Sequence, residues 1–211
     1  MKIKIAITDD HVMVLKGIET MMNTTSEVSV IATYTNAQET IDGLKRDNPD
    51  VLLLDINLPD INGIDLSKQL LKVYPELKII ALTNFEDISF VKRMLKNGVR
   101  GYLLKNTDKI ELVEAIKAVL SGDLYVQKSI NDKLLNQLSS KPTNNGLHIK
   151  LTRREHDVLI GISEELTTQQ ISEKLFISPK TVETHRMNIM SKLGAKNSVG
   201  IIKIAIEKHL L

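Results

Sequence analysis

Two hydrophobic periodicities alternate along the first 125 residues of the chain. Short runs of consecutive apolar residues are typical of strands that are buried on both faces of a sheet. Longer segments with apolar residues at three- and four-residue spacing predict amphipathic helices. The predicted strands are residues 3–8, 28–34, 51–54, 79–83 and 101–104, and the predicted helices are residues 12–23, 37–46, 63–73, 88–97 and 109–121. Five strand–helix repeats predict a doubly wound α/β fold with a five-stranded parallel sheet.

Capping and turn residues agree with these boundaries. Asn36, followed three residues later by Glu39, predicts a capping box at the start of the second helix. Gly98 and Gly122 come directly after two predicted helices. They predict helix ends, because glycine adopts the left-handed conformation that terminates many helices.

The remainder of the chain has a different pattern. Residues 126–150 contain a short helical segment and then a polar, turn-forming stretch, which predicts a linker. From residue 151 onward all signals are helical. Thr152 and Thr167 begin capping boxes, Ser178 precedes a proline at a first helical position, and Asn197 can cap a last helix. Four helices in residues 151–211, the second and third joined by a short turn, predict a helix-turn-helix domain.

Charge and composition exclude several classes of protein and of functional site. The net charge of +2 divides into −3 over residues 1–125, +3 over residues 126–150 and +2 over residues 151–211, which favours an anionic partner for the second half. The chain has no cysteine, which excludes disulfides, thiolate zinc sites and a cysteine nucleophile. No apolar run approaches the ~18 residues of a membrane span, and no signal peptide precedes the first strand. We therefore expect a cytoplasmic protein without membrane contact.

Charged and hydroxyl side chains follow the predicted strands of the first domain. Asp9 and Asp10 follow the first strand, Asp55 follows the third, Thr83 ends the fourth and Lys105 follows the fifth. The carboxyl ends of parallel strands share one edge of the sheet, where ligands bind in this fold class. Three clustered carboxylates repel one another unless a cation is present, and a hard ion such as Mg²⁺ suits them. The five histidines show no ligand spacing, so we do not expect them to bind metal.

These residues carry a family resemblance. Asp9-Asp10, Asp55 within Leu-Leu-Leu-Asp-Ile-Asn-Leu-Pro, Thr83 and Tyr102-Leu-Leu-Lys105 resemble the receiver domain of two-component response regulators. The tail, from Leu-Thr-Arg-Arg-Glu to Lys-Leu-Gly-Ala-Lys, resembles a LuxR-type helix-turn-helix. Together the two parts are similar to the NarL/FixJ family of transcription factors. The resemblance implies a flavodoxin-like receiver with strand order 2-1-3-4-5 at residues 1–125, and a DNA-binding domain at residues 151–211.

The resemblance also implies the chemistry of the acidic edge. Asp55 would be the phospho-acceptor, attacking a phosphohistidine of a sensor histidine kinase or a small acyl phosphate. Asp10, Asp55 and the backbone carbonyl of Asn57 would ligate Mg²⁺, and Asp9 would hold the ion or its waters. Lys105 would pair with the phosphoryl oxygens. The receiver could then catalyse its own phosphorylation from acyl phosphates and its own dephosphorylation, without being a turnover enzyme.

Signalling would pass through Thr83, which would bind the phosphoryl group, and Tyr102, which would move toward Thr83. Asn84 stands where receivers typically have a small residue, which bears on access to the phosphoryl group. Phosphorylation would promote homodimerisation and binding to double-stranded promoter DNA. Two alternatives stay open: an atypical regulator controlled by partner binding, and a Mg²⁺-dependent phosphatase of the haloacid-dehalogenase type. The phosphatase needs a general acid two residues after its nucleophile, where this chain has Asn57.

The third helix of the tail is the predicted recognition helix. Val182, Ile189 and Leu193 share one face and predict its core seam. Recognition helices read bases from the opposite face, and the resemblance favours DNA as the partner. Met187 stands where many relatives have a basic residue. The predicted DNA contacts are Lys180, Thr181, Glu183, Thr184, His185, Met187, Asn188 and Lys192.

Overall fold

A computed structural model describes residues 2–84, 88–139, 151–195, 197–208 and 210–211 of the chain. The chain divides into two compact units, Met1–Ser139 and Ser140–Leu211. Within the described residues, no helix is both long enough and apolar enough to cross a membrane.

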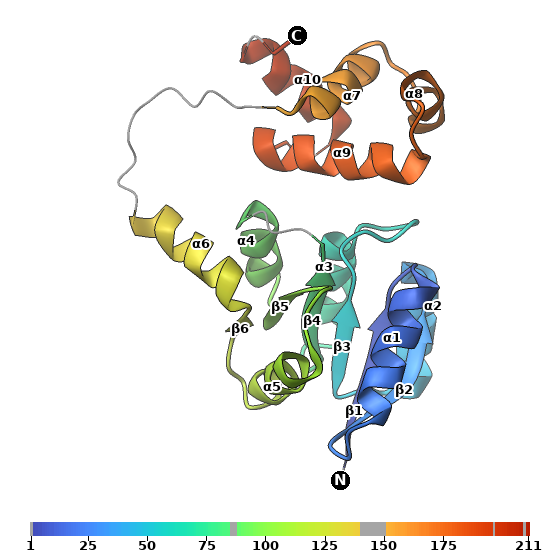
Figure 1. Ribbon diagram of the computed structural model, residues 1–211, viewed down its shortest axis with the longest axis vertical. Coiled ribbons are helices and arrows are strands. Elements are labelled where there is room, and N and C mark those ends of the chain that lie inside the picture. Colours follow the sequence, from blue (N-terminus) through green and yellow to red (C-terminus); the bar gives the residue numbers. More distant parts are fainter. Residues whose placement is uncertain (1, 85–87, 140–150, 196, 209) are drawn as a thin grey trace. The chain divides into compact units, whose positions relative to one another are not determined.

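The first unit is built on a parallel sheet (Figure 1). Its strands are β1 (Ile3–Thr8), β2 (Val28–Tyr34), β3 (Val51–Leu54), β4 (Lys78–Thr83), β5 (Gly101–Leu104) and β6 (Tyr125–Val126). Their order is β2-β1-β3-β4-β5-β6, so the predicted order of the first five strands is confirmed. The sixth strand was not predicted, because two residues are too short to produce a hydrophobic period.

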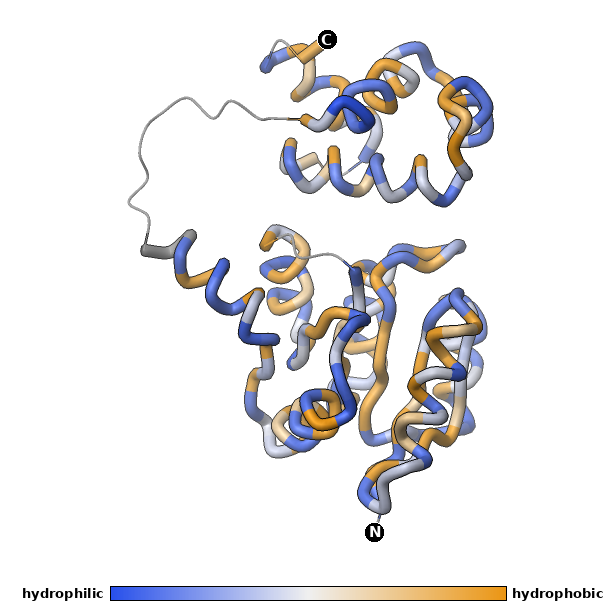
Figure 2. Tube along the Cα trace, viewed as in Figure 1, coloured by the Kyte–Doolittle hydropathy of each residue, from blue (hydrophilic) through white to orange (hydrophobic). Residues whose placement is uncertain are grey.

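Helices cover both faces of this sheet. They are α1 (Val12–Asn23), α2 (Ala37–Asp47), α3 (Gly63–Val73), α4 (Ile88–Lys96) and α5 (Lys109–Leu120). Helices α1 and α5 pack on one face through a cluster that includes Leu15, Ile18, Leu112 and Ile116. Alternate residues of the central strands face the opposite side, where α2, α3 and α4 lie in sequence order (Figure 1). Figure 2 shows the central strands largely in hydrophobic colours, as expected for a sheet buried on both faces.

The first unit extends beyond residue 125. Helix α6 (Lys128–Ser139) packs against α4, and its Ile130 is fully buried. The chain enters this helix through β6, where the backbone N–H of Gln127 donates to the carbonyl of Tyr102 at 3.0 Å. Residues 126–139 therefore belong to the first unit, although the sequence places them in the linker. The rest of the predicted linker, residues 140–150, lies outside the described residues.

The predicted helix termini are largely confirmed. Gly98 and Gly122 have positive φ angles of 100° and 93° after α4 and α5. Asn36 caps α2 by accepting a hydrogen bond from the Glu39 backbone at 2.8 Å. The second hydrogen bond of the predicted capping box differs. The Glu39 carboxylate accepts from the backbone N–H of Thr35 at 2.7 Å and not from that of Asn36.

The second unit is helical in all its described secondary structure. Its helices are α7 (Arg153–Ser163), α8 (Thr168–Leu175), α9 (Pro179–Leu193) and α10 (Ser198–Glu207). Thr152 and Thr167 form the two predicted capping boxes, and Ser178 caps α9 ahead of Pro179. Helix α9 contacts the other three helices around a core that contains Val158, Ile171, Val182, Ile189 and Ile201. Helices α8 and α9 are joined by a short turn at residues 176–178, as the sequence predicts for a helix-turn-helix.

Candidate functional site: an acidic pocket and a recognition helix

The sheet brings the predicted acidic residues together at the carboxyl ends of its strands. The backbone N–H of Asp55 donates to the Thr8 carbonyl at 2.9 Å, which places Asp55 beside the end of β1. The backbone N–H of Lys105 donates to the Thr83 carbonyl at 2.8 Å, which fixes the start of the Lys105 side chain beside β4. Residues that are widely separated in sequence thus meet at one edge because the strands are parallel and in register.

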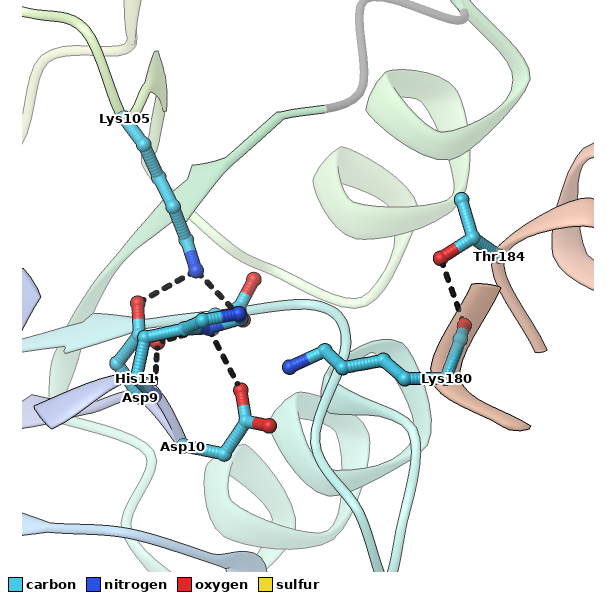
Figure 3. A network of polar contacts seen from close by, with 7 residues as sticks. Asp9, Asp10, His11, Lys105, Lys180 and Thr184 are labelled. Carbon is cyan, nitrogen blue, oxygen red and sulfur yellow. Dashed lines mark hydrogen bonds and ion pairs between the residues drawn. The ribbon is translucent and has the colours of Figure 1, made fainter. Parts of the chain in front are cut away.

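Lys105 links two of the carboxylates. Its ammonium nitrogen lies 2.8 Å from Oδ2 of Asp55 and 2.6 Å from Oδ2 of Asp9. Figure 3 shows the long side chain reaching down to Asp9. The side chains of Asp9 and Asp55 are 1% and 2% exposed, and that of Lys105 is 8% exposed. Buried carboxylates require a charged partner, and here one ammonium serves two of them.

Burial and charge shift the pKa values of this pair. Burial raises the pKa of Asp55 above its ordinary value, the Lys105 ammonium opposes that rise, and the Asp9 charge adds to it. Burial by itself lowers the pKa of Lys105, but the carboxylates of Asp55 and Asp9 raise it further, so the net direction is upward. Lys105 therefore remains charged at neutral pH. A further cation in the pocket would favour the ionised form of Asp55.

His11 joins the cluster, although the histidine spacing gave no reason to expect it. Its Nδ1 lies 3.0 Å from Oδ1 of Asp9 and 2.9 Å from Oδ1 of Asp10, and Figure 3 shows the ring beside Asp10. Asp9, Asp10, His11 and Asp55 each offer a donor atom within 4.8 Å of the others. The available signal for His11 is its place directly after Asp9-Asp10, because an aspartate commonly accepts the backbone N–H two residues on, and Oδ1 of Asp9 accepts that of His11 at 2.9 Å.

The loop after Asp55 is tightly closed. The backbone N–H of Gly63 donates to the Ile56 carbonyl at 2.8 Å, and a Cβ atom at Gly63 would lie 2.1 Å from the Asp55 carbonyl oxygen. Only glycine permits this approach of α3 to the backbone of Asp55. The Asn57 backbone N–H donates to the Asp55 carboxylate, so the loop that carries Asn57 folds over Asp55.

The predicted signalling pair lies inside the sheet. Thr83 and Tyr102 are both 0% exposed. Tyr102 is paired with Ala81, two residues before Thr83, so the side chains of Thr83 and Tyr102 lie on the same face. Asn84, directly after Thr83, is exposed at the carboxyl edge. The role of Thr83 and Tyr102 in signalling stays a prediction.

Helix α9 carries the residues predicted to contact DNA. Lys180, Thr184 and Asn188 are partly exposed and recur at four-residue spacing along one face. The Thr184 hydroxyl donates to the Lys180 carbonyl at 3.1 Å, which keeps that side chain against its own helix (Figure 3). Thr181 and His185 are also partly exposed.

Three other predicted DNA contacts have surroundings that the sequence did not predict. The Lys192 ammonium lies 2.6 Å from Oε2 of Glu155 in α7. The Glu183 carboxylate accepts a hydrogen bond from the hydroxyl of Thr168. Met187 is 6% exposed, whereas the helical period places it on the outward face.

The fold and the two sites define a receiver domain joined to a helix-turn-helix domain. The sequence profile described as "Response regulator receiver domain" matches residues 5–117, and the profile described as "Bacterial regulatory proteins, luxR family" matches residues 150–205. The chain belongs to the response regulator family. It is a transcription factor with a receiver domain and a LuxR-type DNA-binding domain.

Individual relatives agree over almost the whole chain. The oxygen regulatory protein NreC of Staphylococcus aureus is 34% identical over 214 aligned residues, which cover 99% of each chain. The response regulator ChrA of a heme-sensing two-component system matches 100% of this chain and 99% of its own, with 27% identity and a TM-score of 0.55. RcsB of Salmonella enterica serovar Typhimurium, solved on the promoter rprA with phosphomimetic BeF3⁻, matches 96% of this chain and 98% of its own, with 27% identity and a TM-score of 0.61.

Proposed function

We propose that Asp55 accepts a phosphoryl group and that this modification controls binding of the second domain to promoter DNA. The observation that carries the proposal is the environment of the Asp55 carboxylate, which is buried at the carboxyl edge of the sheet with the Lys105 ammonium 2.8 Å away. Phosphoryl transfer requires mainly in-line positioning and neutralisation of charge, and the Lys105 ammonium beside Asp55 supports the proposal because it supplies part of that neutralisation.

The transfer itself is a simple exchange of bonds. An oxygen of Asp55 attacks phosphorus, a new O–P bond forms, and the N–P bond to a phosphohistidine of a sensor histidine kinase breaks. The leaving imidazole takes a proton, and an acyl phosphate forms on Asp55. Lys105 is close enough to Asp55 to pair with the new phosphoryl oxygens as a fixed positive charge.

The donor set also suits Mg²⁺. Asp9, Asp10 and Asp55 bring three carboxylates within 4.8 Å of one another, and the single ammonium of Lys105 leaves a negative excess. These carboxylates and the backbone carbonyl of Asn57 would hold the ion. Oxygen ligands of this kind are those that Mg²⁺ prefers. When bound, the ion would neutralise part of the charge on the phosphoryl oxygens.

Thr83 and Tyr102 are proposed as the element that reports phosphorylation. Both side chains are buried on the same face of the sheet, and Thr83 ends the strand next to Lys105. The Thr83 hydroxyl would bind the phosphoryl group, and Tyr102 would fill the space that Thr83 leaves. A buried aromatic ring has few alternative positions in a close-packed interior, which favours a two-state response.

The second domain is proposed to read DNA through the exposed face of α9. Lys180 would bind a DNA phosphate at the amino end of the helix, and Asn188 would form hydrogen bonds with a base edge in the major groove. The other proposed DNA contacts are Thr181, Glu183, Thr184, His185, Met187 and Lys192. Two of these, Lys192 and Glu183, already bind groups within their own domain. RcsB, solved on promoter DNA with a phosphomimetic, supports the link between phosphate and DNA. We further propose that phosphorylation promotes homodimerisation and that the protein acts in the cytoplasm.

Incubation with acetyl phosphate and Mg²⁺ tests the proposal. Intact mass should rise by one phosphoryl group, and size-exclusion chromatography should show a larger species. Asp55→Asn should abolish both changes while the circular dichroism spectrum stays native. Labelling that persists in Asp55→Asn would place the acceptor elsewhere. A wild-type protein that takes up no phosphate from acetyl phosphate or from any kinase would favour regulation by partner binding.

A further inference from the structure

The loop that follows the proposed phospho-acceptor is attached to the start of helix α2. Asp60 lies in this β3–α3 loop, five residues after Asp55. Its Oδ1 accepts the backbone N–H of Ala37 at 2.9 Å, and its Oδ2 accepts the backbone N–H of Gln38 at 3.0 Å. Both oxygens of one carboxylate therefore bind the first two N–H groups of α2, those of Ala37 and Gln38, which are 23 and 22 positions away in sequence.

The first turn of α2 is a favourable partner for a negative charge. The first four N–H groups of a helix have no acceptor within the helix, and the helix dipole is positive at this end. In α2 the capping residue Asn36 satisfies the third and fourth groups, those of Glu39 and Thr40. Asp60 satisfies the remaining two. Its pKa lies below the ordinary value, because the backbone hydrogen bonds outweigh the rise that burial causes.

The same turn of α2 is also bound to strand β1. The hydroxyl of Thr40 donates to the Asn36 carbonyl at 2.8 Å. Its only hydrogen is thereby used, so the Thr8 hydroxyl is the donor in the 2.9 Å contact between the two threonines. Both side chains are buried, and Thr8 directly precedes Asp9. The start of α2 is therefore fixed to the end of β1, the strand that Asp9 and Asp10 follow.

The sheet positions Asp55 itself, but it does not extend to the loop. Asp55 donates its backbone N–H to β1, whereas residues 56–62 have left the strand. The bond from Gly63 to Ile56 closes the base of the loop, and the buried Leu58 anchors its middle. Asp60 supplies the contact that joins the outer part of the loop to α2. Asn57, whose carbonyl would serve as a metal ligand, lies between the anchor at Asp55 and the anchor at Asp60.

We propose that Asp60 is a positioning residue for the acidic pocket: by binding the first turn of α2, it holds the β3–α3 loop, and Asn57 within it, in place relative to Asp9 and Asp10. This inference rests on the proposed function of the pocket in binding Mg²⁺ and phosphoryl. Asp60 does not touch the reacting atoms. It acts through α2, which is bound both to the β3–α3 loop and to β1. Asn57 in that loop and Asp9 and Asp10 after β1 are thereby held in place before the ion arrives.

The proposal is tested by Mg²⁺ affinity in the full-length protein. Asp60→Ala should weaken Mg²⁺ binding, measured by isothermal titration calorimetry, by about two- to fivefold, the range expected for a carboxylate at a helix amino terminus. Phosphorylation by acetyl phosphate should slow by a similar factor at low Mg²⁺ and approach the wild-type rate at saturating Mg²⁺. Asp60→Asn should give an intermediate affinity, because its amide oxygen can still accept from one N–H group.

Asp65→Ala is the matched control. Asp65 is exposed in the first turn of α3 and carries the same charge at the start of another helix, so this variant measures the loss of a charge and of a helix-terminal interaction without the contact to α2. An Asp60→Ala protein with the Mg²⁺ affinity of Asp65→Ala would overturn the positioning role, even if its urea midpoint were lower. If the wild-type protein itself bound no Mg²⁺ and took up no phosphate, the proposed function of the pocket would fail and the positioning role with it. If the wild-type protein binds Mg²⁺ and takes up phosphate, and the Asp60 variants do so equally well, only the positioning role fails.

Discussion

The Lys192 ammonium and the Glu155 carboxylate lie 2.6 Å apart and join the third helix of the DNA-binding domain to the first. The same Oε2 atom of Glu155 accepts the backbone N–H of Thr152 at 2.7 Å, so one carboxylate caps α7 and holds α9. The Glu155 side chain is 4% exposed, which makes this pair a structural contact of the domain core. Lys192, a cation in α9, thus stabilises the fold of the second domain.

Glu155→Gln should lower the stability of the second domain in a pH-dependent way. Burial raises the pKa of Glu155, but the hydrogen bonds and charge of Lys192 and the Thr152 N–H lower it more, so the net pKa lies below its ordinary value of 4.5. The stabilisation is therefore complete above about pH 4.5 and is lost as the pH falls through the depressed pKa.

Hydrogen exchange of the α7 and α9 amides in the full chain measures this effect. At neutral pH the variant should lose about 1.5–3 kcal/mol of opening free energy, the usual value for a hydrogen bond to a charged group. The difference from wild type should shrink on acidification below pH 4.5. A difference that stays constant over that range would contradict the assignment of charge to Glu155.

Lys105→Met should destabilise the receiver domain and make its stability more dependent on Mg²⁺. Removing the ammonium leaves Asp9 and Asp55 as buried carboxylates without their counter-charge, at a cost of about 3 kcal/mol at neutral pH. A bound cation would restore part of that loss, because a ligand that binds only the folded state stabilises it. Urea unfolding with and without excess Mg²⁺ measures both effects. Lys96→Met, at an exposed position of α4, should show neither.

Gly63→Ala should be the most damaging single-methyl change in the loop after Asp55. The new Cβ would lie 2.1 Å from the Asp55 carbonyl oxygen, so the backbone of the acceptor or the start of α3 must move. We expect a loss of about 3 kcal/mol in thermal or urea unfolding, together with slower phosphorylation. Gly17→Ala in α1 is the control. A Cβ there meets no atom within 4 Å, so the protein should gain up to about 1 kcal/mol from helix propensity.

Two substitutions in α9 separate base reading from phosphate binding. Asn188→Ala should cost roughly 1–3 kcal/mol on a preferred site and little on scrambled DNA, because an amide can bind an adenine edge with two hydrogen bonds. Lys180→Ala should weaken both duplexes equally and reduce the magnitude of the salt slope by about one. Lys203→Ala, exposed in α10, is the charge control. Equal weakening of both duplexes by Asn188→Ala would remove its role in base reading.

The strand order of the first five strands was implied by the family resemblance. The sheet itself could be predicted from the repeating hydrophobic pattern, and the meeting of Asp9, Asp10, Asp55 and Lys105 could be predicted because these residues follow strand ends. The surroundings of these residues could not. The spacing between the histidines gives no sign of His11, which reaches the pocket because it directly follows Asp9 and Asp10. Asp60 binds α2 across 22 residues or more, and an exposed aspartate in a loop has no sequence signal for such a contact.

In the DNA-binding domain, the angular positions of residues around α9 predicted which side chains face the core. They did not predict which groups the other side chains of α9 bind. Val182, Ile189 and Leu193 are buried as predicted. Lys192 lies away from that seam, and its long side chain reaches α7, which a single-helix projection does not include. The linker boundary moved for a similar reason: two residues of β6 and the buried Ile130 attach residues 126–139 to the receiver through contacts that only the folded sheet creates.

The β6 strand has a practical consequence for building hybrid regulators. Its pairing with β5 gives Tyr102 a neighbouring strand, and the first residues of α6 follow at once. A junction placed at residue 125 would interrupt β6, the partner of β5, and would replace Ile130, which is fully buried. A receiver transplanted onto another output domain should therefore be cut after Ser139, where the first compact unit ends, so that the fusion inherits an intact sheet edge.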